Sequence, residues 1–224
     1  MNKKNSLAVL FDLDGTLVDT APDMIATLLE IISTQNNGNS IPKDSIRNYV
    51  SDGSIGLIKL AFPNADRNET KQLQQKFLSI YQNNLCKKTK VFESLRNLLR
   101  IFEKHHIKWG VVTNKPSRMT IPLFRELNLA CKYIISGDTL AYHKPNPKPL
   151  LLACSLMNIK PENAIYVGDA KRDIDAGIAA GMKTISAKYG YIKNKDNLKF
   201  WGSDLIASTP SHLGILIKKE LRIT

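Results

Sequence analysis

The sequence predicts an α/β fold in which a parallel sheet is interrupted by a small helical segment. Two observations support this prediction. Short apolar runs alternate with helical patterns of about ten residues over most of the chain, as in βαβ units. The alternation stops between about Asp19 and Lys90, where the sequence predicts helices and no strand.

Six short apolar runs are the expected strands, and the last of them is the weakest. Because they alternate with helices, they should lie parallel in one sheet, with ligands at the carboxyl ends of the strands. The expected strands are 7–11, 107–113, 133–136, 164–168, 184–187 and 204–207. The expected helices between and after them are 95–104, 117–127, 147–157, 171–180 and 210–221.

The segment after the first strand should form a separate helical unit. Thr20 is a suitable N-cap, and Pro22 and Asp23 suit a first helical turn, so we expect a helix that runs to about Asn36. The polar stretch 36–40 should end it, and further helices are expected over 42–50, 55–62 and 66–85. We therefore predict a core formed by residues 1–18 and 91–224, with residues 19–90 as the inserted unit.

The end of the first expected strand carries the clearest chemical signal, Phe11-Asp12-Leu13-Asp14-Gly15-Thr16. Two carboxylates that are two residues apart on an extended chain point to the same side. A bound cation is the simplest way to compensate such a concentration of negative charge. The alternative is an acidic turn that faces solvent.

A second pair of acids follows the fourth expected strand. Asp169 ends this strand, and Asp173 lies four residues on, so both carboxylates can face one point. Asp173 also has an ordinary explanation, because acids are common in the first turn of a helix.

Two polar motifs complete the set. Thr113 and Asn114 close the second strand just before a helix, where hydroxyl, amide and backbone N–H groups can bind an anion. Lys144 lies in the rigid loop His143-Lys144-Pro145-Asn146-Pro147 after the third strand and could hold a point charge over a phosphate. Taken singly, the first motif could be helix capping and the second a solvated lysine.

The order and spacing of the four motifs resemble those of the haloacid dehalogenase superfamily over nearly the whole chain. The resemblance implies a Rossmann-like core, with residues 19–90 as a mobile helical cap that selects the substrate. It implies that Asp12 is a nucleophile that becomes phosphorylated and that Asp14 is the general acid and base. It further implies Mg²⁺ bound by Asp12, Asp14, Asp169 and Asp173, and phosphoryl oxygens held by Thr113, Asn114 and Lys144. Ala170 departs from the Ser, Thr or Asp that members often carry after the Gly-Asp of the fourth motif.

Local stretches resemble the phosphoglycolate phosphatase group more closely. They are 109–116, 144–147, Tyr189-Gly190-Tyr191 and 201–204, and within the group they look most like the branch that acts on N-acetylmuramic acid 6-phosphate. The first expectation is therefore a phosphatase for phosphoglycolate, and the second is a phosphatase for the muramic acid sugar or another sugar phosphate. A phosphomutase would use the same Asp12 and Asp14. A nucleic-acid-binding protein on this scaffold has only the net charge in its favour.

In the expected cap, Arg47 and the turn Ser51-Asp52-Gly53 are the candidates for substrate selection. Arg47 could meet a carboxylate, which both proposed substrates carry. The alternative is that Arg47 is an ordinary residue of a surface helix.

The formal net charge of +12 fits either an attraction for anionic partners or a solvated surface. Lys and Arg are spread along the chain without interleaved aromatics, so we expect a small phosphorylated metabolite as partner and no nucleic acid. No apolar run is long enough to span a membrane, and the run 7–11 is too short for a signal peptide. These features predict a cytoplasmic protein, and they leave open whether it is a monomer or a homodimer.

Overall fold

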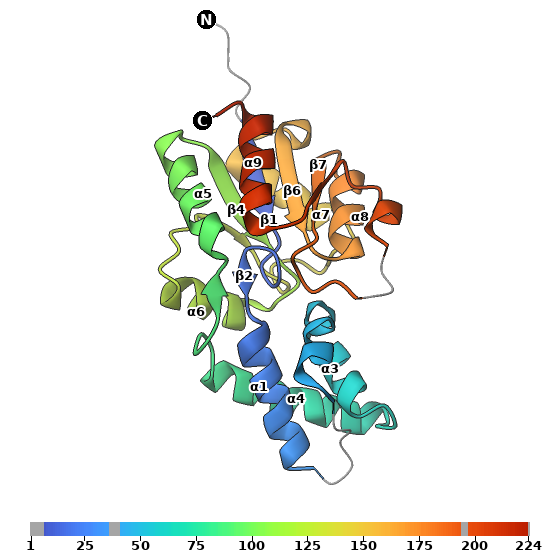
Figure 1. Cartoon of the computed structure of the whole chain (residues 1–224). Helices are drawn as coiled ribbons and strands as arrows, with labels where there is room; N and C mark the ends of the chain where they lie inside the picture. Colours follow the sequence, from blue (N-terminus) through green and yellow to red (C-terminus); the bar gives the residue numbers. More distant parts are fainter. Residues whose placement is uncertain (1–6, 36–40, 194–196, 224) are drawn as a thin grey trace, which may run out of the picture.

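The computed structural model describes residues 7–35, 41–193 and 197–223 and confirms the expected α/β core (Figure 1). Within these residues one sheet contains six parallel strands in the order β5-β4-β1-β6-β7-β8. The neighbours β4 and β6 flank β1 on its two sides, so the ends of these three strands lie side by side. The strands are β1 (Ala8–Phe11), β4 (Lys108–Val112), β5 (Tyr133–Ile135), β6 (Ala164–Gly168), β7 (Lys183–Ala187) and β8 (Leu205–Ala207).

Helices cover both faces of the sheet, which explains why its strands are apolar throughout rather than alternating. Val9 and Phe11 of β1 pack in one apolar cluster with α5, α6 and α9. Ala8 and Leu10 pack in a second cluster with α7 and α8 on the opposite face. The bounds are α5 (Glu93–Lys104), α6 (Ser117–Glu126), α7 (Lys148–Met157), α8 (Lys171–Ala179) and α9 (Pro210–Leu221), with short 3-10 turns η2 (Pro161–Asn163) and η3 (Leu198–Trp201).

The helices after β1 pack on one another around an apolar cluster that also includes Met119 and Tyr191 of the core, and they lie beside the carboxyl ends of the strands (Figure 1). We call them the helical insert. The expected helix 42–50 is wrong as a single element, because α2 ends at Arg47 and a separate 3-10 turn follows. The polar stretch 36–40 lies outside the described residues. The insert contains α1 (Ala21–Ser33), α2 (Lys43–Arg47), η1 (Val50–Asp52), α3 (Gly53–Ala61) and α4 (Arg67–Asn83).

The two ends of the insert are joined by a second, very small sheet. Strand β2 (Val18–Asp19) pairs antiparallel with β3 (Lys90–Val91), and Val18 lies opposite Val91. The expectation that residues 19–90 contain no strand is therefore wrong at both ends of that segment. Two-residue strands are too short to show an alternating pattern in the sequence.

Thr20 flanks the start of α1 as expected, but its side chain does not cap the helix. Its hydroxyl donates to Asp14 Oδ1 at 2.6 Å instead. The phenolic oxygen of Tyr191 accepts the backbone N–H groups of Thr20 and Ala21, at 2.8 and 2.9 Å. A residue from far along the chain therefore binds the backbone at the start of α1.

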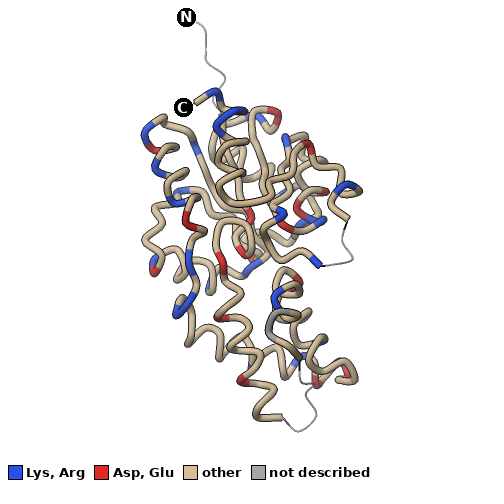
Figure 2. Tube along the Cα trace, in the orientation of Figure 1, with Lys and Arg blue, Asp and Glu red and all other residues tan. Residues whose placement is uncertain are grey.

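Lys and Arg are spread over most of the chain, including the loop before β3 and helix α9, and acidic residues lie between them (Figure 2). In the part of the chain that the structure describes, no helix combines the length and the apolar character that a membrane crossing requires.

Candidate active site

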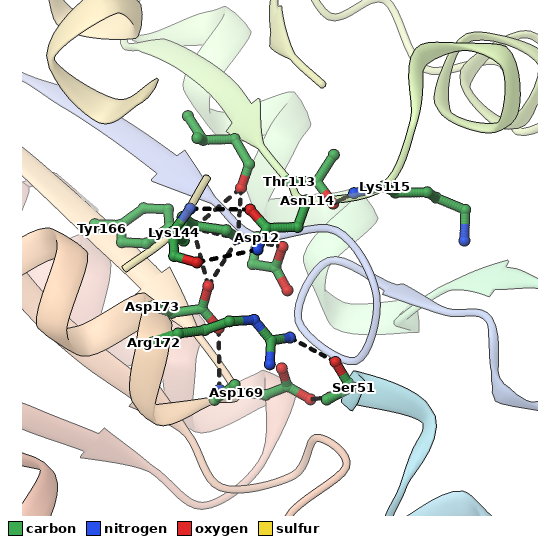
Figure 3. A network of polar contacts seen from close by, with 12 residues as sticks. Asp12, Ser51, Thr113, Asn114, Lys115, Lys144, Tyr166, Asp169, Arg172 and Asp173 are labelled. Atoms are coloured by element: carbon green, nitrogen blue, oxygen red, sulfur yellow. Dashed lines mark hydrogen bonds and ion pairs between the residues drawn. The ribbon is translucent and has the colours of Figure 1, made fainter. Parts of the chain in front are cut away.

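The four sequence motifs meet at the carboxyl edge of the sheet (Figure 3). Asp12 directly follows β1, Thr113 directly follows β4 and Asp169 directly follows β6. Because β1 lies between β4 and β6, these residues are neighbours in space. Lys144 reaches the same place from the loop between β5 and α7.

Three buried acids form a compact cluster at this edge. One carboxylate oxygen from each of Asp12, Asp169 and Asp173 lies within 4.8 Å of the others. Burial raises the pKa of Asp12 to about 6, against the attraction of Lys144. Burial, together with the charges of Asp12 and Asp173, raises the pKa of Asp169 to about 7. The cluster therefore concentrates negative charge in a place where water cannot compensate it.

Asp169 shows directly that the cluster suits a cation. Its Oδ2 accepts hydrogen bonds from Ser51 Oγ at 2.7 Å and from the Tyr191 N–H at 2.8 Å. Its Oδ1 is buried and accepts no hydrogen bond from any described residue. A buried carboxylate oxygen without a donor is costly, and a set of ligands made only of oxygen atoms is the kind that Mg²⁺ prefers. The residues present therefore fit a magnesium ion.

Asp173 has a structural and an electrostatic part in the cluster. Its Oδ2 accepts the Ala170 backbone N–H at 3.0 Å, which caps the start of α8. Its Oδ1 lies 2.7 Å from Lys144 Nζ. The bond from Ala170 uses only the backbone, so a side chain at this position is not needed for it.

Lys144 is buried, and its ammonium group is surrounded by oxygen atoms. Nζ lies 2.7 Å from Asp12 Oδ1 and donates to the Val112 carbonyl and the Tyr166 hydroxyl, both at 2.9 Å. Burial alone would lower the pKa of Lys144, but Asp12 and Asp173 outweigh burial and raise it. The ammonium group therefore stays charged beside Asp12.

Asn114 fixes the loop that carries Lys144. The Asn114 side chain donates to the Lys144 carbonyl at 3.2 Å and accepts from the Lys144 N–H at 3.1 Å. Thr113, the preceding residue, accepts the Lys115 N–H at 3.1 Å and lines the cavity described below.

The carboxylate of Asp14 lies apart from the three-acid cluster. Its Oδ1 lies 2.9 Å from Lys115 Nζ, in addition to its bond from Thr20. Lys115 also donates to the Tyr81 hydroxyl of α4 at 3.1 Å, so a core lysine joins Asp14 to the helical insert. Asp14 and Tyr81 outweigh the effect of burial and raise the pKa of Lys115.

A cavity of about 370 Å³ lies between the motifs and the insert. Ser51, Asp52 and Gly53 line it from the insert, and Asp12, Asp14, Thr113 and Asn114 line it from the core. The expected turn Ser51-Asp52-Gly53 therefore lies across the cavity from the motif residues of the core.

Arg47 lies outside the set of described residues that line the cavity. Its guanidinium pairs with Asp19 at 2.9 Å and lies over the ring of Tyr191, 5.1 Å from the centroid. In the described structure the guanidinium of Arg47 therefore meets the carboxylate of Asp19, and its expected contact with a substrate carboxylate stays a prediction.

Comparison with known proteins agrees with this geometry. The sequence profile of the haloacid dehalogenase-like hydrolases matches residues 9–187, which include all four motifs. The chain belongs to this family.

Two curated relatives of this haloacid dehalogenase-like hydrolase align over nearly their whole length. This chain is 39% identical over 219 residues to the N-acetylmuramic acid 6-phosphate phosphatase of Pseudomonas putida, and the alignment covers 96% of this chain and 97% of the relative. It is 38% identical over 205 residues to the phosphoglycolate phosphatase of Xylella fastidiosa, covering 90% of this chain and 89% of the relative.

The fold of the hydrolase has close counterparts among solved structures. A crystal structure described as a predicted phosphoglycolate phosphatase from Haemophilus somnus 129PT superposes with a TM-score of 0.84. The match has 23% sequence identity and covers 96% of this chain and 99% of the other.

Sequence reasoning missed two cations of the hydrolase that line the cavity, Lys115 and Arg172. Each directly adjoins a predicted motif residue, Asn114 or Asp173, and this adjacency is the signal that could have found them. The bond between Ser51 and Asp169 had no such signal, because the two residues are far apart in the chain.

Proposed function

We propose that this protein is a Mg²⁺-dependent phosphatase that hydrolyses a small phosphate monoester through a phosphorylated Asp12. The observation that carries the proposal is the position of the Asp12 carboxylate. It lies at the carboxyl end of β1, beside Lys144 and the acid cluster, and lines the cavity. A nucleophile, a cation and a metal-binding cluster therefore share one edge of the sheet.

In the first step an oxygen of Asp12 attacks phosphorus, and the bond between phosphorus and the ester oxygen breaks. Among the described residues only Lys144 binds this carboxylate, through Oδ1, so the other oxygen is free to react. With a pKa of about 6, Asp12 is mostly ionised at neutral pH. Two easier steps replace one difficult hydrolysis in this scheme.

Asp14 would move the protons in both steps. It gives a proton to the leaving alkoxide and later takes one from the water that attacks the phosphorylated Asp12, which releases phosphate and restores the carboxylate. Its contacts with Thr20 and Lys115 hold its carboxylate in the wall of the cavity.

The transferring phosphoryl group would be held by Thr113, Asn114 and Lys144, whose N–H, O–H and ammonium groups suit the charge on its oxygens. Asp12, Asp169, Asp173 and the backbone carbonyl of Asp14 would hold Mg²⁺. When bound, the ion neutralises charge on the phosphoryl oxygens.

For the substrate we put phosphoglycolate first, as the relatives named phosphoglycolate phosphatase suggest. N-acetylmuramic acid 6-phosphate is the second candidate, and two observations favour it. The cavity of about 370 Å³ has apolar walls that include Met24, Phe77 and Met119, which leaves room for more than a two-carbon acid. The relatives that act on this sugar phosphate match at up to 39% identity.

The test is phosphate release from both candidates by the purified protein with Mg²⁺, with other sugar phosphates and Asp12→Asn alongside. Release that disappears with EDTA and in the variant supports the proposal, and the preferred ester names the substrate. If wild type releases no phosphate from any of them, the phosphatase function is wrong. Conversion of one sugar phosphate into its isomer would favour a mutase.

A further inference from the structure

Arg172 joins the acid cluster to the helical insert (Figure 3). It lies in the first turn of α8, and its guanidinium donates to the Ser51 backbone carbonyl at 2.6 Å. The hydroxyl of the same serine donates to Asp169 Oδ2 at 2.7 Å. Ser51 is therefore held by two residues of the core that both follow β6.

Arg172 supplies a positive charge that does not depend on pH, because a guanidinium stays protonated throughout the range in which proteins are folded. The side chain also lines the cavity. A permanent positive charge therefore lies between the nucleophile and the wall formed by the insert.

Arg172 also has most of its hydrogen-bonding capacity left. A guanidinium has five N–H donors, and in the described part of the chain only the Ser51 carbonyl takes a hydrogen bond from it. Lys144, by contrast, is surrounded by Asp12, Asp173, a carbonyl and a hydroxyl. Lys115 is already bound by Asp14 and Tyr81.

The balance of charges in the site favours binding of an anion by the Arg172 guanidinium. The four carboxylates of the sequence motifs face three cations, namely Lys115, Lys144 and Arg172, while Asp52 of the insert pairs with Lys193. A divalent cation bound by the acids would make the net charge of the motif carboxylates and these three cations positive, which favours an anion beside the guanidinium. A phosphoryl group supplies such an anion, and a planar guanidinium can bind two of its oxygens at once.

We propose that Arg172 binds an anionic oxygen of the substrate's phosphoryl group, and that its bond to Ser51 couples this binding to docking of the helical insert. The proposal rests on the phosphatase function and names a further substrate-binding residue for it. Binding of the phosphoryl group fixes the guanidinium, and the fixed guanidinium holds the insert over the cavity.

The first experiment measures the affinity of inorganic phosphate by isothermal titration calorimetry in the presence of Mg²⁺. Arg172→Gln should weaken phosphate binding by about 10-fold to 100-fold, the range expected for loss of a charged hydrogen bond. Lys171→Met is the matched control, because Lys171 is the exposed neighbour in α8 and, among the residues that the structure describes, pairs only with Asp175. Its affinity should equal that of wild type.

The second experiment tests the coupling by hydrogen–deuterium exchange of peptides that cover residues 48–61. Phosphate should slow exchange of this segment in wild type and in Lys171→Met, but not in Arg172→Gln. If Arg172→Gln does not fold, both measurements are made on Arg172→Lys instead. Lysine keeps the charge but offers a compact ammonium in place of the planar fork that can bind two phosphate oxygens side by side, so this variant should bind phosphate at least several-fold more weakly.

Phosphate affinity or phosphate-dependent protection that is unchanged in a folded Arg172 variant would overturn the inference, as would a wild type that binds no phosphate. These outcomes are separate from the test of the phosphatase function. A wild type that hydrolyses an ester, with phosphate binding independent of Arg172, refutes this inference alone. A wild type that binds phosphate through Arg172 but hydrolyses no ester refutes the phosphatase function alone.

Discussion

Replacing Asp169 by Asn should make the metal-free protein more stable at pH 8. In wild type, Asp169 must carry its charge in a buried cluster with Asp12 and Asp173, and its Oδ1 has no donor among the described residues. Asparagine removes the charge but keeps an oxygen that can accept from Ser51 and Tyr191. Its amide group can also donate into the acid cluster.

The size of the effect follows from the pKa of Asp169, which rises from 3.8 to about 7 on folding. Because the folded state holds this proton more tightly, wild type loses stability as the pH rises from about 4 to about 7. Each pKa unit corresponds to about 1.4 kcal/mol, which gives an upper bound of about 4 kcal/mol. Asp12 shares in this repulsion, so we expect a gain of about 1–3 kcal/mol for the variant. That gain corresponds to a rise in Tm of roughly 2–12 °C for a protein of this size.

The assay is thermal unfolding in EDTA from pH 4 to pH 8, with and without added Mg²⁺. The advantage of Asp169→Asn should be absent near pH 4 and complete near pH 8. Mg²⁺ should raise the Tm of wild type by binding the folded state, and should have little effect on the variant. A variant that is less stable than wild type in EDTA at pH 8 refutes the reasoning, and so does equal stabilisation of both proteins by Mg²⁺.

Three further predictions concern neighbouring residues. Asp14→Asn should lower kcat by about 100-fold to 10,000-fold through loss of proton transfer, while Mg²⁺ still raises its Tm; a kcat within tenfold of wild type would contradict the assigned role. Lys144→Met should cost about 3–5 kcal/mol in metal-free urea unfolding, because two buried carboxylates lose their cation; a loss below about 1 kcal/mol would speak against it. Gly15→Ala should abolish the stabilising effect of Mg²⁺, because its φ is +78° and a Cβ there would lie 2.2 Å from Asp169 Oδ2; a wild-type response to Mg²⁺ in calorimetry would refute this.

The parts of the molecule that the sequence predicted well are those with a local signal. The strands that precede Asp12 and Asp169 are short apolar runs that end abruptly in an acid, because they are buried on both faces and stop at the acid cluster. In a parallel sheet the carboxyl ends of β1, β4 and β6 lie at the same edge, and this can be inferred without knowing any side-chain contact. The core and the grouping of the motif residues could therefore be predicted from the sequence.

The contacts that close the site could not be predicted, because they join residues that are distant in the chain and carry no pattern. Tyr191 accepts the backbone N–H groups of Thr20 and Ala21, and the Thr20 hydroxyl binds Asp14 instead of capping α1. Local rules made Thr20 an N-cap because they cannot see a tyrosine brought in by the fold. The pairing of Arg47 with Asp19 escaped prediction for the same reason.

The small sheet formed by β2 and β3 has a consequence for how the protein can change over time. Because Val18 lies opposite Val91, the segment between them leaves the core and returns to it at one point. Lengthening a loop that is already long costs little, about 0.6 kcal/mol for each doubling. Residues 20–89 can therefore be enlarged, shortened or replaced as a block while β1, β4 and β6 keep their register. A change in the length of this block would thus leave the residues that end β1, β4 and β6 in place, provided that the contacts of Thr20, Ser51 and Tyr81 with the site are kept.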